Sequence, residues 1–289
     1  MIIVRISGGL GNQMFQYAAA KQLAVQNGDT YKLDLSFYRK YKLREYQLKF
    51  FNTEDNIATE RECIRLRGKE EIFHKLQRRL GLPIRRPHSY VRESSQTNPE
   101  AFLSYHRSGD LYLDGHWQSQ GYFSQIAHLL TKEFTTKANL SRSASGYLQQ
   151  IRSVNSVSLH IRRGDYVNNA RAHALHGVLP PTYYKKATAT IIGFLADPTF
   201  FIFSDDIPWS RANMSLPGQT VFIEYTKHPT EDLELMKHCK HNIVANSSFS
   251  WWGAWLNPNR SKIVTAPRYW FKQPKRSSHR IVPPQWITL

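Results

Sequence analysis

Short apolar runs alternate with amphipathic segments along this chain. The apolar run 2–6 predicts a buried strand, and segment 12–26 repeats apolar residues at helical spacing. A glycine-rich turn at 7–11 joins the two, and residues 31–35 predict a second strand. Strand, turn, helix and strand in this order predict a βαβ unit and therefore a parallel sheet.

The second half of the chain repeats this alternation. Between its strands, a helix is expected to open at Pro180-Pro181-Thr182 and run to about Leu195, and another is expected to start at Ser247. The pattern predicts a second domain of the doubly wound α/β type. Its predicted strands lie at 156–161, 199–204, 219–224, 241–245 and 262–266.

A polar stretch at 141–145 separates the two patterns and is typical of a domain boundary. A helix over 122–137 is expected just before it. We therefore predict an α/β fold with two Rossmann-like domains, 1–145 and 146–289, which face a central cleft. Clefts of this kind commonly bind anionic cofactors and substrates.

Composition and charge narrow the class of protein. The chain has 289 residues, of which 41% are hydrophobic, so it can form a folded core. Its net charge of +17 predicts attraction to nucleic acid, a phosphorylated small molecule or a membrane surface. Segment 61–92 is strongly basic and carries a helical stripe of Ile72, Phe73, Leu76 and Leu80. It is either a solvated basic face or a contact with an anionic membrane.

The cysteines indicate the compartment. Cys63 and Cys239 form no C-x-x-C pair, which argues against a disulfide scaffold and a zinc ribbon. Sparse cysteine usage suits a reducing compartment. The sequence shows neither a signal peptide nor an apolar run of about 18 residues. We therefore expect a cytoplasmic protein, with segment 61–92 as its candidate contact with the inner face of the membrane.

Gly9, Gly11 and Asn12 lie in the glycine turn, where the first strand passes into the first helix. Backbone N–H groups at a helix N-terminus bind anions, so the turn is a candidate phosphate site. It departs from the G-x-G-x-x-G of dinucleotide-binding dehydrogenases and lacks the G-K-[ST] of a P-loop. The residues alone leave nucleotide binding and tight packing both open.

The run HIRRGDY, residues 160–166, ends the first strand of the second domain. The imidazole of His160 and the guanidinium of Arg162, at a strand end, suit a diphosphate. Asp165 follows Arg162 by three residues at the expected cleft edge, and it is our candidate for the catalytic base. The alternative is a clamp that holds Arg162 or Arg163 through a charge-assisted pair.

Ser204, Asp205 and Asp206 end the next strand. Adjacent carboxylates at a strand end accept ribose hydroxyls or a base edge, or they ligate Mg²⁺. The pair departs from D-x-D spacing, so we favour nucleotide recognition over metal binding.

Asn246, Ser247 and Ser248 lie where a later strand passes into a helix. Hydroxyl groups beside the first backbone N–H groups of a helix predict a second phosphate site. Trp251 and Trp255 follow four residues apart on one helix face, which favours packing over ligand stacking.

Together these blocks resemble the α-1,2-fucosyltransferases of glycosyltransferase family 11, of bacterial type. The resemblance runs from residue 1 to about 266 and is weak in segment 61–92. It implies a GT-B fold and inverting transfer of L-fucose from GDP-fucose to a galactose 2-hydroxyl, with no required metal. The blocks are GGLGNQMFQYA (8–18), HIRRGDY (160–166), FSDD (203–206) and ANSSFSWW (245–252), in the family's order.

The resemblance also implies roles for single residues. Arg162 would bind the β-phosphate of the donor, and Asn12 would close on the donor from the first domain. His160 and one of the two carboxylates Asp205 and Asp206 would hold the guanosine. Phosphate contacts would come from Ser247 and Ser248.

The acceptor is expected mainly on the first domain. His116, Trp117 and Gln118 form a polar–aromatic–polar group suited to a sugar, whose C–H face can stack on an indole. A buried tryptophan in a turn is the equal alternative. The acceptor class is a terminal β-galactoside in an oligosaccharide or a glycolipid.

Other functions were weighed against this one. The basic charge is compatible with a nucleic-acid-binding protein, but no helix-turn-helix, RRM or zinc-finger pattern is present. We therefore predict no nucleic-acid partner. A fucosyltransferase of another linkage is the alternative within the same class.

Overall fold

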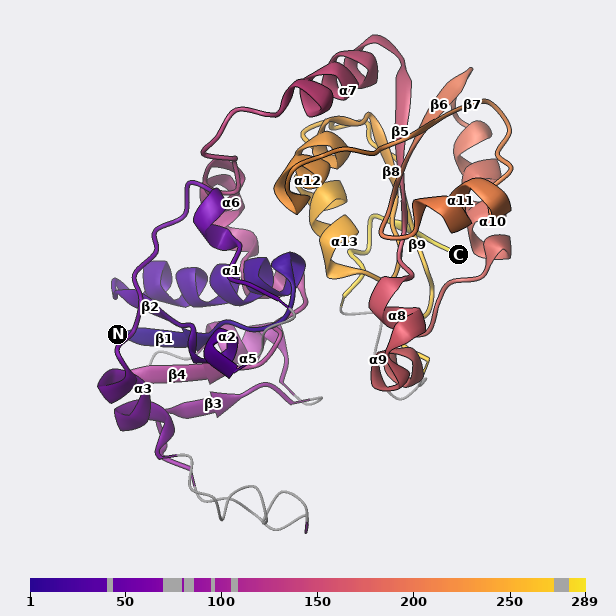
Figure 1. Cartoon of the computed structure of the whole chain (residues 1–289). Helices are drawn as coiled ribbons and strands as arrows, with labels where there is room; N and C mark the ends of the chain where they lie inside the picture. Colours follow the sequence, from indigo (N-terminus) through magenta and orange to yellow (C-terminus); the bar gives the residue numbers. More distant parts are fainter. Residues whose placement is uncertain (41–43, 70–79, 81–85, 95–96, 105–108, 273–280) are drawn as a thin grey trace. The chain divides into compact units, whose positions relative to one another are not determined.

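The computed structural model describes residues 1–40, 44–69, 80, 86–94, 97–104, 109–272 and 281–289. The chain forms two compact units, Met1–Glu133 and Phe134–Leu289 (Figure 1). We expected the boundary after residue 145, but that position lies inside helix α7 (Arg142–Ser153), and the two units divide between Glu133 and Phe134. The polar residues there belong to a helix start, because the Ser141 side chain accepts a hydrogen bond from the backbone N–H of Ala144.

The first unit contains a four-stranded parallel sheet in the order β2-β1-β4-β3. Its strands are β1 (Ile2–Arg5), β2 (Tyr31–Asp34), β3 (Tyr90–Arg92) and β4 (Leu111–Asp114). Its helices are α1 (Leu10–Asn27), α2 (Ser36–Lys40), α3 (Glu60–Arg67), α5 (Pro99–Leu103) and α6 (Ala127–Glu133). The 3₁₀ turns are η1 (Leu48–Phe50), η2 (Gln120–Tyr122) and η3 (Ser124–Ile126).

The second unit contains a six-stranded parallel sheet in the order β10-β9-β8-β5-β6-β7. Its strands are β5 (Asn155–Ile161), β6 (Pro198–Ser204), β7 (Gln219–Phe222), β8 (His241–Ile243), β9 (Val264–Ala266) and β10 (Ile287–Thr288). Its further helices are α8 (Gly164–Asn168), α9 (Ala170–Leu175), α10 (Pro181–Ile192), α11 (Ile207–Asn213), α12 (Pro229–His238) and α13 (Ser248–Trp255).

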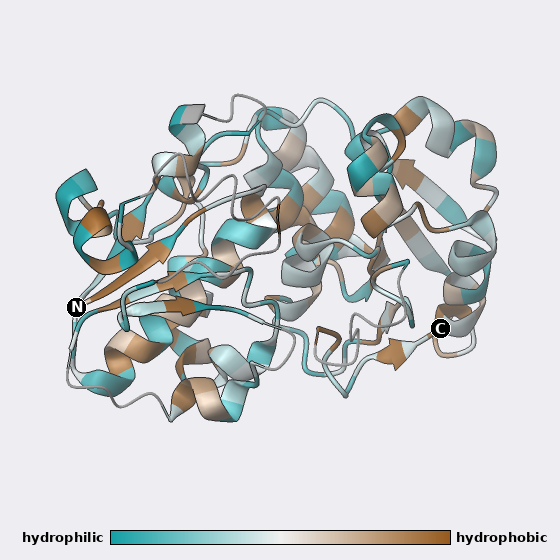
Figure 2. Ribbon diagram, turned by 90° about the horizontal axis from the view of Figure 1, so that it is seen from below, coloured by the Kyte–Doolittle hydropathy of each residue, from teal (hydrophilic) through white to brown (hydrophobic). Residues whose placement is uncertain are grey.

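Both sheets are buried and apolar, as parallel strands covered by helices require. The strand beside the N-terminus, β1, is largely brown in Figure 2, and its residues Ile2, Ile3 and Val4 are buried. In the second unit β5 and β6 are buried on both faces. Val157 and Ile202 pack in a cluster with α10, and Phe201 packs in another with α7 and α12.

The strands predicted from the hydrophobic pattern are confirmed, with ends that differ by no more than two residues. The helix expected over 122–137 is wrong in extent. Two 3₁₀ turns precede it, the α-helix begins at Ala127, and it ends at Glu133. Phe123 has a φ of −151° and a ψ of 12°, which lie outside the helical region and break a continuous helix at that point.

The basic segment 61–92 contains α3 and β3, but its apolar stripe at Ile72, Phe73 and Leu76 lies outside the described residues. Leu80 is described and exposed. Among the helices that the structure describes, none is long and apolar enough to span a bilayer.

Candidate active site

The carboxyl ends of β5 and β8 lie side by side in the second sheet. In this sheet β6 and β7 extend from one side of β5, and β8, β9 and β10 extend from the other. Doubly wound sheets bind ligands outside the carboxyl ends of their strands at such a switch point. The motifs at 160–166 and 245–255 follow these two strands, so the structure brings them together.

Two contacts join the loops that follow β5 and β8. The Tyr166 hydroxyl donates a hydrogen bond of 3.0 Å to the backbone oxygen of Asn246. The rings of His160 and Phe249 pack with their centroids 5.8 Å apart. The end of β5 therefore contacts α13 through His160, and Tyr166 of α8 contacts the loop between β8 and α13.

Arg162 is held by two carboxylates. Its Nη2 lies 2.5 Å from Asp165 Oδ1, and its Nη1 lies 2.7 Å from Asp205 Oδ2. The Tyr166 ring lies beneath the guanidinium, 5.5 Å from Cζ to the ring centroid. A planar cation held at both ends presents its remaining N–H groups in one fixed direction. The contact between Arg162 and Asp165 is the clamp named above as the alternative to a base.

Arg163 has a different set of partners. Its Nε donates to Asp206 Oδ2 at 3.0 Å, and its Cζ lies 3.8 Å from the centroid of the Trp209 ring. Its backbone N–H donates to Asp205 Oδ1 at 2.8 Å. The second arginine of the motif thus fastens the end of β5 to α11.

Asp205 and Asp206 hold these arginines. Asp206 is also the N-cap of α11, because its Oδ1 accepts the backbone N–H of Trp209 at 3.1 Å. The Arg163 guanidinium holds the pKa of the Asp206 carboxyl below its usual range. Ser204 Oγ accepts the backbone N–H of Asp206 at 3.0 Å. The contact with a nucleotide predicted for these residues stays a prediction, since the observed contacts are internal.

Gly164, the first residue of α8, allows the segment after β5 to approach Asp205 after β6. A Cβ at this position would lie 2.6 Å from Asp205 Oδ2, closer than side-chain atoms tolerate. The glycine inside the motif is therefore required by the carboxylate that holds Arg162.

His160 is a buried, neutral imidazole. It is 5% exposed, and burial lowers its pKa to about 3. Its Nδ1 has no hydrogen-bond partner among the described residues. The guanosine contact predicted for His160 stays a prediction.

The start of α13 is the second predicted phosphate site. Ser247 is its N-cap and gives no side-chain hydrogen bond to the helix, and Ser248 is its first residue. Asn246 is only 1% exposed, and its amide donates to the backbone oxygens of His176 and Gly177 at 3.0 and 3.3 Å. The Asn246 amide nitrogen thus anchors the α9 loop, and the nucleotide contact predicted for this residue stays a prediction.

The glycine turn of the first unit lies at the corresponding edge of the other sheet. Gly8 is the residue that requires glycine, with a φ of +77°, whereas Gly9 is the extended N-cap of α1 and Gly11 is helical. The Gly8 backbone oxygen accepts hydrogen bonds from the Gln13 side chain at 3.2 Å and from the Tyr38 hydroxyl at 2.9 Å. The turn is rigid, and whether Gly9 and Gly11 touch a nucleotide stays a prediction.

The loop after β4 joins this turn. Gln118 Nε2 donates to Asn12 Oδ1 at 2.7 Å, so the two predicted ligand-binding residues lie together. The Trp117 ring is 0% exposed and packs against Phe102 and Tyr122. The expectation that Trp117 stacks on a sugar is wrong, because no face of the indole is open. His116, beside it, is exposed.

Sequence reasoning missed three residues that support these loops. Trp209 underlies Arg163, Tyr166 joins β5 to β8, and Glu93 holds the loop after β4. Tyr166 is the last residue of the motif 160–166, so its place in the motif could have indicated a role at the site. Trp209 and Glu93 lie far from their partners in sequence, and no spacing pattern links them.

Metal binding has little support in the described ranges. No group of three or more His, Cys, Asp or Glu side chains is arranged to hold a metal ion among those residues. The two adjacent aspartates are paired with arginines instead.

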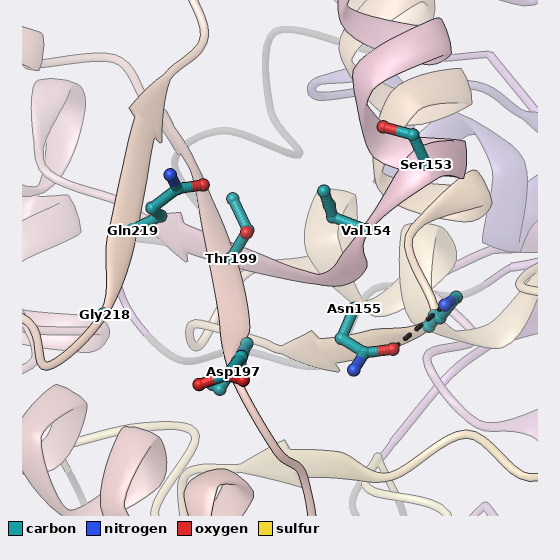
Figure 3. Close-up of a pocket in the computed structure, with 9 residues that line it drawn as sticks. Ser153, Val154, Asn155, Asp197, Thr199, Gly218 and Gln219 are labelled. Atoms are coloured by element: carbon teal, nitrogen blue, oxygen red, sulfur yellow. Dashed lines mark hydrogen bonds between the residues drawn. The ribbon is translucent and has the colours of Figure 1, made fainter.

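A pocket of about 570 Å³ lies at the opposite, amino-terminal edge of the second sheet (Figure 3). There Lys240 Nζ donates to Asn155 Oδ1 at 3.0 Å, and Asp197 and Gln219 line the rim. None of the residues predicted to bind donor or acceptor lines this pocket.

Comparisons with known proteins agree with the motifs. The chain is 33% identical over its whole length to an alpha-1,2-colitosyltransferase of Escherichia coli, of which the match covers 99%. It is 23% identical to the galactoside 2-alpha-L-fucosyltransferase Sec1 of Mus musculus, over 99% of this chain and 71% of that protein.

A solved structure shares the fold. A mutant of Arabidopsis thaliana FUT1 in complex with GDP matches 91% of this chain and 69% of its own with a TM-score of 0.53, at 10% identity. The predicted GT-B fold class, with its parallel sheets, is thereby confirmed. The model of glycosyl transferase family 11 matches residues 1–289. The chain therefore belongs to glycosyl transferase family 11 and is a glycosyltransferase.

Proposed function

We propose that this protein transfers L-fucose from GDP-fucose to the 2-hydroxyl of a terminal β-galactoside, forming an α-1,2 linkage. The relatives named for 2-alpha-fucosyl and alpha-1,2-colitosyl transfer support the linkage and the sugar class. The observation that carries the proposal is the clamped Arg162 at the switch point of the second sheet, in a loop that Tyr166 bonds to Asn246 before α13.

In this proposal Arg162 stabilises the leaving group. As the bond between the anomeric carbon and the β-phosphate oxygen breaks, negative charge collects on that phosphate. A fixed guanidinium and the backbone N–H groups at the start of α13 offset this charge without reorganising. Asp165 and Asp205 hold the guanidinium in place, so in our proposal they act through Arg162.

Metal independence is part of the proposal. An inverting displacement needs the leaving phosphate to be stabilised, and Arg162 with the Ser247 and Ser248 segment supplies donors for that purpose. The pairing of Asp205 and Asp206 with arginines supports this proposal, because it leaves their oxygens engaged.

A second candidate donor is GDP-colitose. Colitose is L-fucose without its 3-hydroxyl group, and the 33% identical relative is named for colitosyl transfer. Both donors would present the same GDP to the phosphate site, so discrimination between them would depend on contacts to the 3-position of the sugar.

We propose that the reaction takes place in the cytoplasm. The free, buried state of Cys63 and Cys239 supports a reducing compartment. The membrane contact of segment 61–92 stays a prediction, since most of its apolar stripe lies outside the described residues.

The test is a transfer assay with purified protein. GDP-fucose and GDP-colitose are each incubated with lactose and with lacto-N-biose, and the products are analysed by NMR. We expect an α-linked deoxy sugar on O2 of the galactose. Transfer to a different hydroxyl would favour another linkage. Absence of transfer, together with salt-dependent binding of duplex DNA, would favour the nucleic-acid alternative.

A further inference from the structure

Two parallel aromatic rings lie beside Arg162 in the second unit. The imidazole of His176, which ends α9, packs on the Tyr166 ring with the centroids 4.7 Å apart and 1° between the ring planes. The Arg162 guanidinium lies against the same Tyr166 ring, 5.5 Å from Cζ to the centroid. Phe271 packs on His176 in turn, with the centroids 5.3 Å apart. Packed rings therefore connect the clamped cation with the loop after α9.

Hydrogen bonds close these contacts into a circuit of three residues. The Tyr166 hydroxyl donates to the backbone oxygen of Asn246 at 3.0 Å, and the Asn246 amide donates to the backbone oxygen of His176 at 3.0 Å. The packing of His176 on Tyr166 completes the circuit. Of these three contacts, only the packing of the two rings depends on the His176 side chain.

The circuit determines how the Tyr166 ring is oriented. The backbone oxygen of Tyr166 lies 2.9 Å from His173 Nδ1, and the hydroxyl bond to Asn246 fixes the far end of the side chain. Rotation of a tyrosine ring about its Cβ–Cγ bond is otherwise broadly permitted, because that torsion has no sharp minima. The parallel imidazole of His176 thus sets the plane in which the Tyr166 ring lies.

The plane of the Tyr166 ring matters for the Arg162 guanidinium. Asp165 and Asp205 hold its two Nη atoms, but two such bonds leave rotation about the line that joins the carboxylates. A planar guanidinium stacks on aromatic faces, so the ring against which it lies opposes that rotation. The tilt of Arg162 therefore depends on the plane of Tyr166.

We propose that His176 is a positioning residue that holds the Tyr166 ring in the plane required by Arg162. This inference rests on the proposed function, in which Arg162 binds the β-phosphate of the donor. His176 acts through Tyr166. Without the imidazole, the Tyr166 ring turns about its Cβ–Cγ bond, and the guanidinium loses its fixed tilt toward the phosphate. Small displacements of a group that contacts the reacting phosphate are costly, so GDP binding depends on the stack.

The test measures GDP and GMP binding by calorimetry in wild type and in three variants of His176. His176→Phe keeps a flat ring and should bind GDP as wild type does. His176→Leu and His176→Gln keep the backbone bond to Asn246 but have no ring, and their affinity for GDP should fall about 10-fold. GMP has no β-phosphate, so its affinity should stay the same in all four proteins. Thermal unfolding checks that each variant is folded, and either variant without a ring suffices for the comparison.

A double-mutant cycle shows whether the effect passes through Arg162. In the Arg162→Lys background, His176→Leu should leave the remaining GDP affinity unchanged, because an ammonium group has no plane for a ring to orient. The control is His128→Leu, at an exposed histidine of α6, which should keep the wild-type affinities for both nucleotides.

The outcomes separate this inference from the function on which it rests. Equal losses of GDP and GMP affinity would mean that the His176 ring only maintains the loop, and the inference would be wrong. It would also be wrong if the variants without a ring bound GDP normally, if His176→Phe lost as much affinity as His176→Leu, or if His176→Leu weakened GDP binding further in the Arg162→Lys background. In each of these cases the proposed function stands. If wild type binds no GDP, the proposed donor site fails and the inference fails with it.

Discussion

At the residue scale, the fixed position of Arg162 depends on its two carboxylates. Asp165 and Asp205 approach different nitrogens of the same guanidinium, at 2.5 and 2.7 Å. Charge-assisted bonds of this geometry are stronger than neutral ones and resist rotation of the side chain. A substitution at either carboxylate should therefore weaken the binding of any ligand that Arg162 contacts.

Asp165→Asn tests whether this residue clamps or catalyses. The neutral amide holds Arg162 less firmly, so we expect GDP to bind more weakly and kcat to fall with it. Calorimetric GDP titration and steady-state kinetics measure both. A large loss of kcat with unchanged GDP affinity would identify Asp165 as a base and contradict the clamp.

His160 should make the protein sensitive to acid. Its pKa is about 3 in the folded protein and about 6.5 when unfolded, so between these values the unfolded chain binds the extra proton. The stability is complete above pH 6.5 and is lost as pH falls, by up to about 1.4 kcal/mol per pH unit.

Urea unfolding of wild type and His160→Gln at pH 7 and at pH 4.5 measures this effect. The stability of the variant should fall less between the two pH values. An equal fall in both proteins would mean that His160 does not stay neutral.

At the element scale, the site depends on how closely β5 and β6 approach. Their pairing runs from Asn155 opposite Pro198 to Ile161 opposite Ser204, so the two strands end together. The arginines follow one strand, and the aspartates follow the other. The short helices α8 and α11 begin at once behind them, which leaves little room for added atoms.

The variant Gly164→Ala distinguishes the steric effect of an added methyl group from the effect of alanine on helix stability. The added methyl group meets Asp205 Oδ2 at 2.6 Å, so we expect weaker GDP binding although alanine favours helix. The matched control is Gly146→Ala in α7, where nothing lies within 4 Å of the new Cβ. Gly146→Ala should raise the free energy of unfolding by up to about 1 kcal/mol and leave GDP binding unchanged. Equal GDP affinity in both variants would show that the contact at Gly164 does not matter.

At the scale of the whole molecule, the two sheets and most of their strands could be predicted from the sequence. Apolar runs such as 156–161 have the length of a strand, and turn residues bound them, so the pattern identifies them as strands. The boundary at 145 was wrong because a polar helix start resembles a linker in composition.

The motif residues Arg162 and Asp205 were found by position, but their pairing was not. Side-chain contacts between distant segments, such as Arg163 with Trp209, leave no local pattern. The burial of Trp117 and Asn246 could not be predicted, because a strand end alone does not show which side chain turns inward.

Chelation should leave transfer largely intact. In our account Arg162 and the start of α13 supply the charge that a metal ion would otherwise supply. Initial rates are compared with and without EDTA, after the protein has been passed through a chelating resin. Loss of activity that Mg²⁺ or Mn²⁺ restores would assign a metal to the reaction.

The central claim is that the carboxyl edge of the second sheet binds the donor diphosphate through Arg162. The most direct measurement is calorimetric titration of GDP into wild type, Arg162→Lys and Arg162→Ala, with thermal unfolding as a check of folding. We expect wild type to bind GDP, Arg162→Lys to bind it far more weakly, and Arg162→Ala to show no measurable binding while remaining folded. Equal GDP affinity in wild type and folded Arg162→Ala would contradict the claim and place the donor elsewhere on the protein.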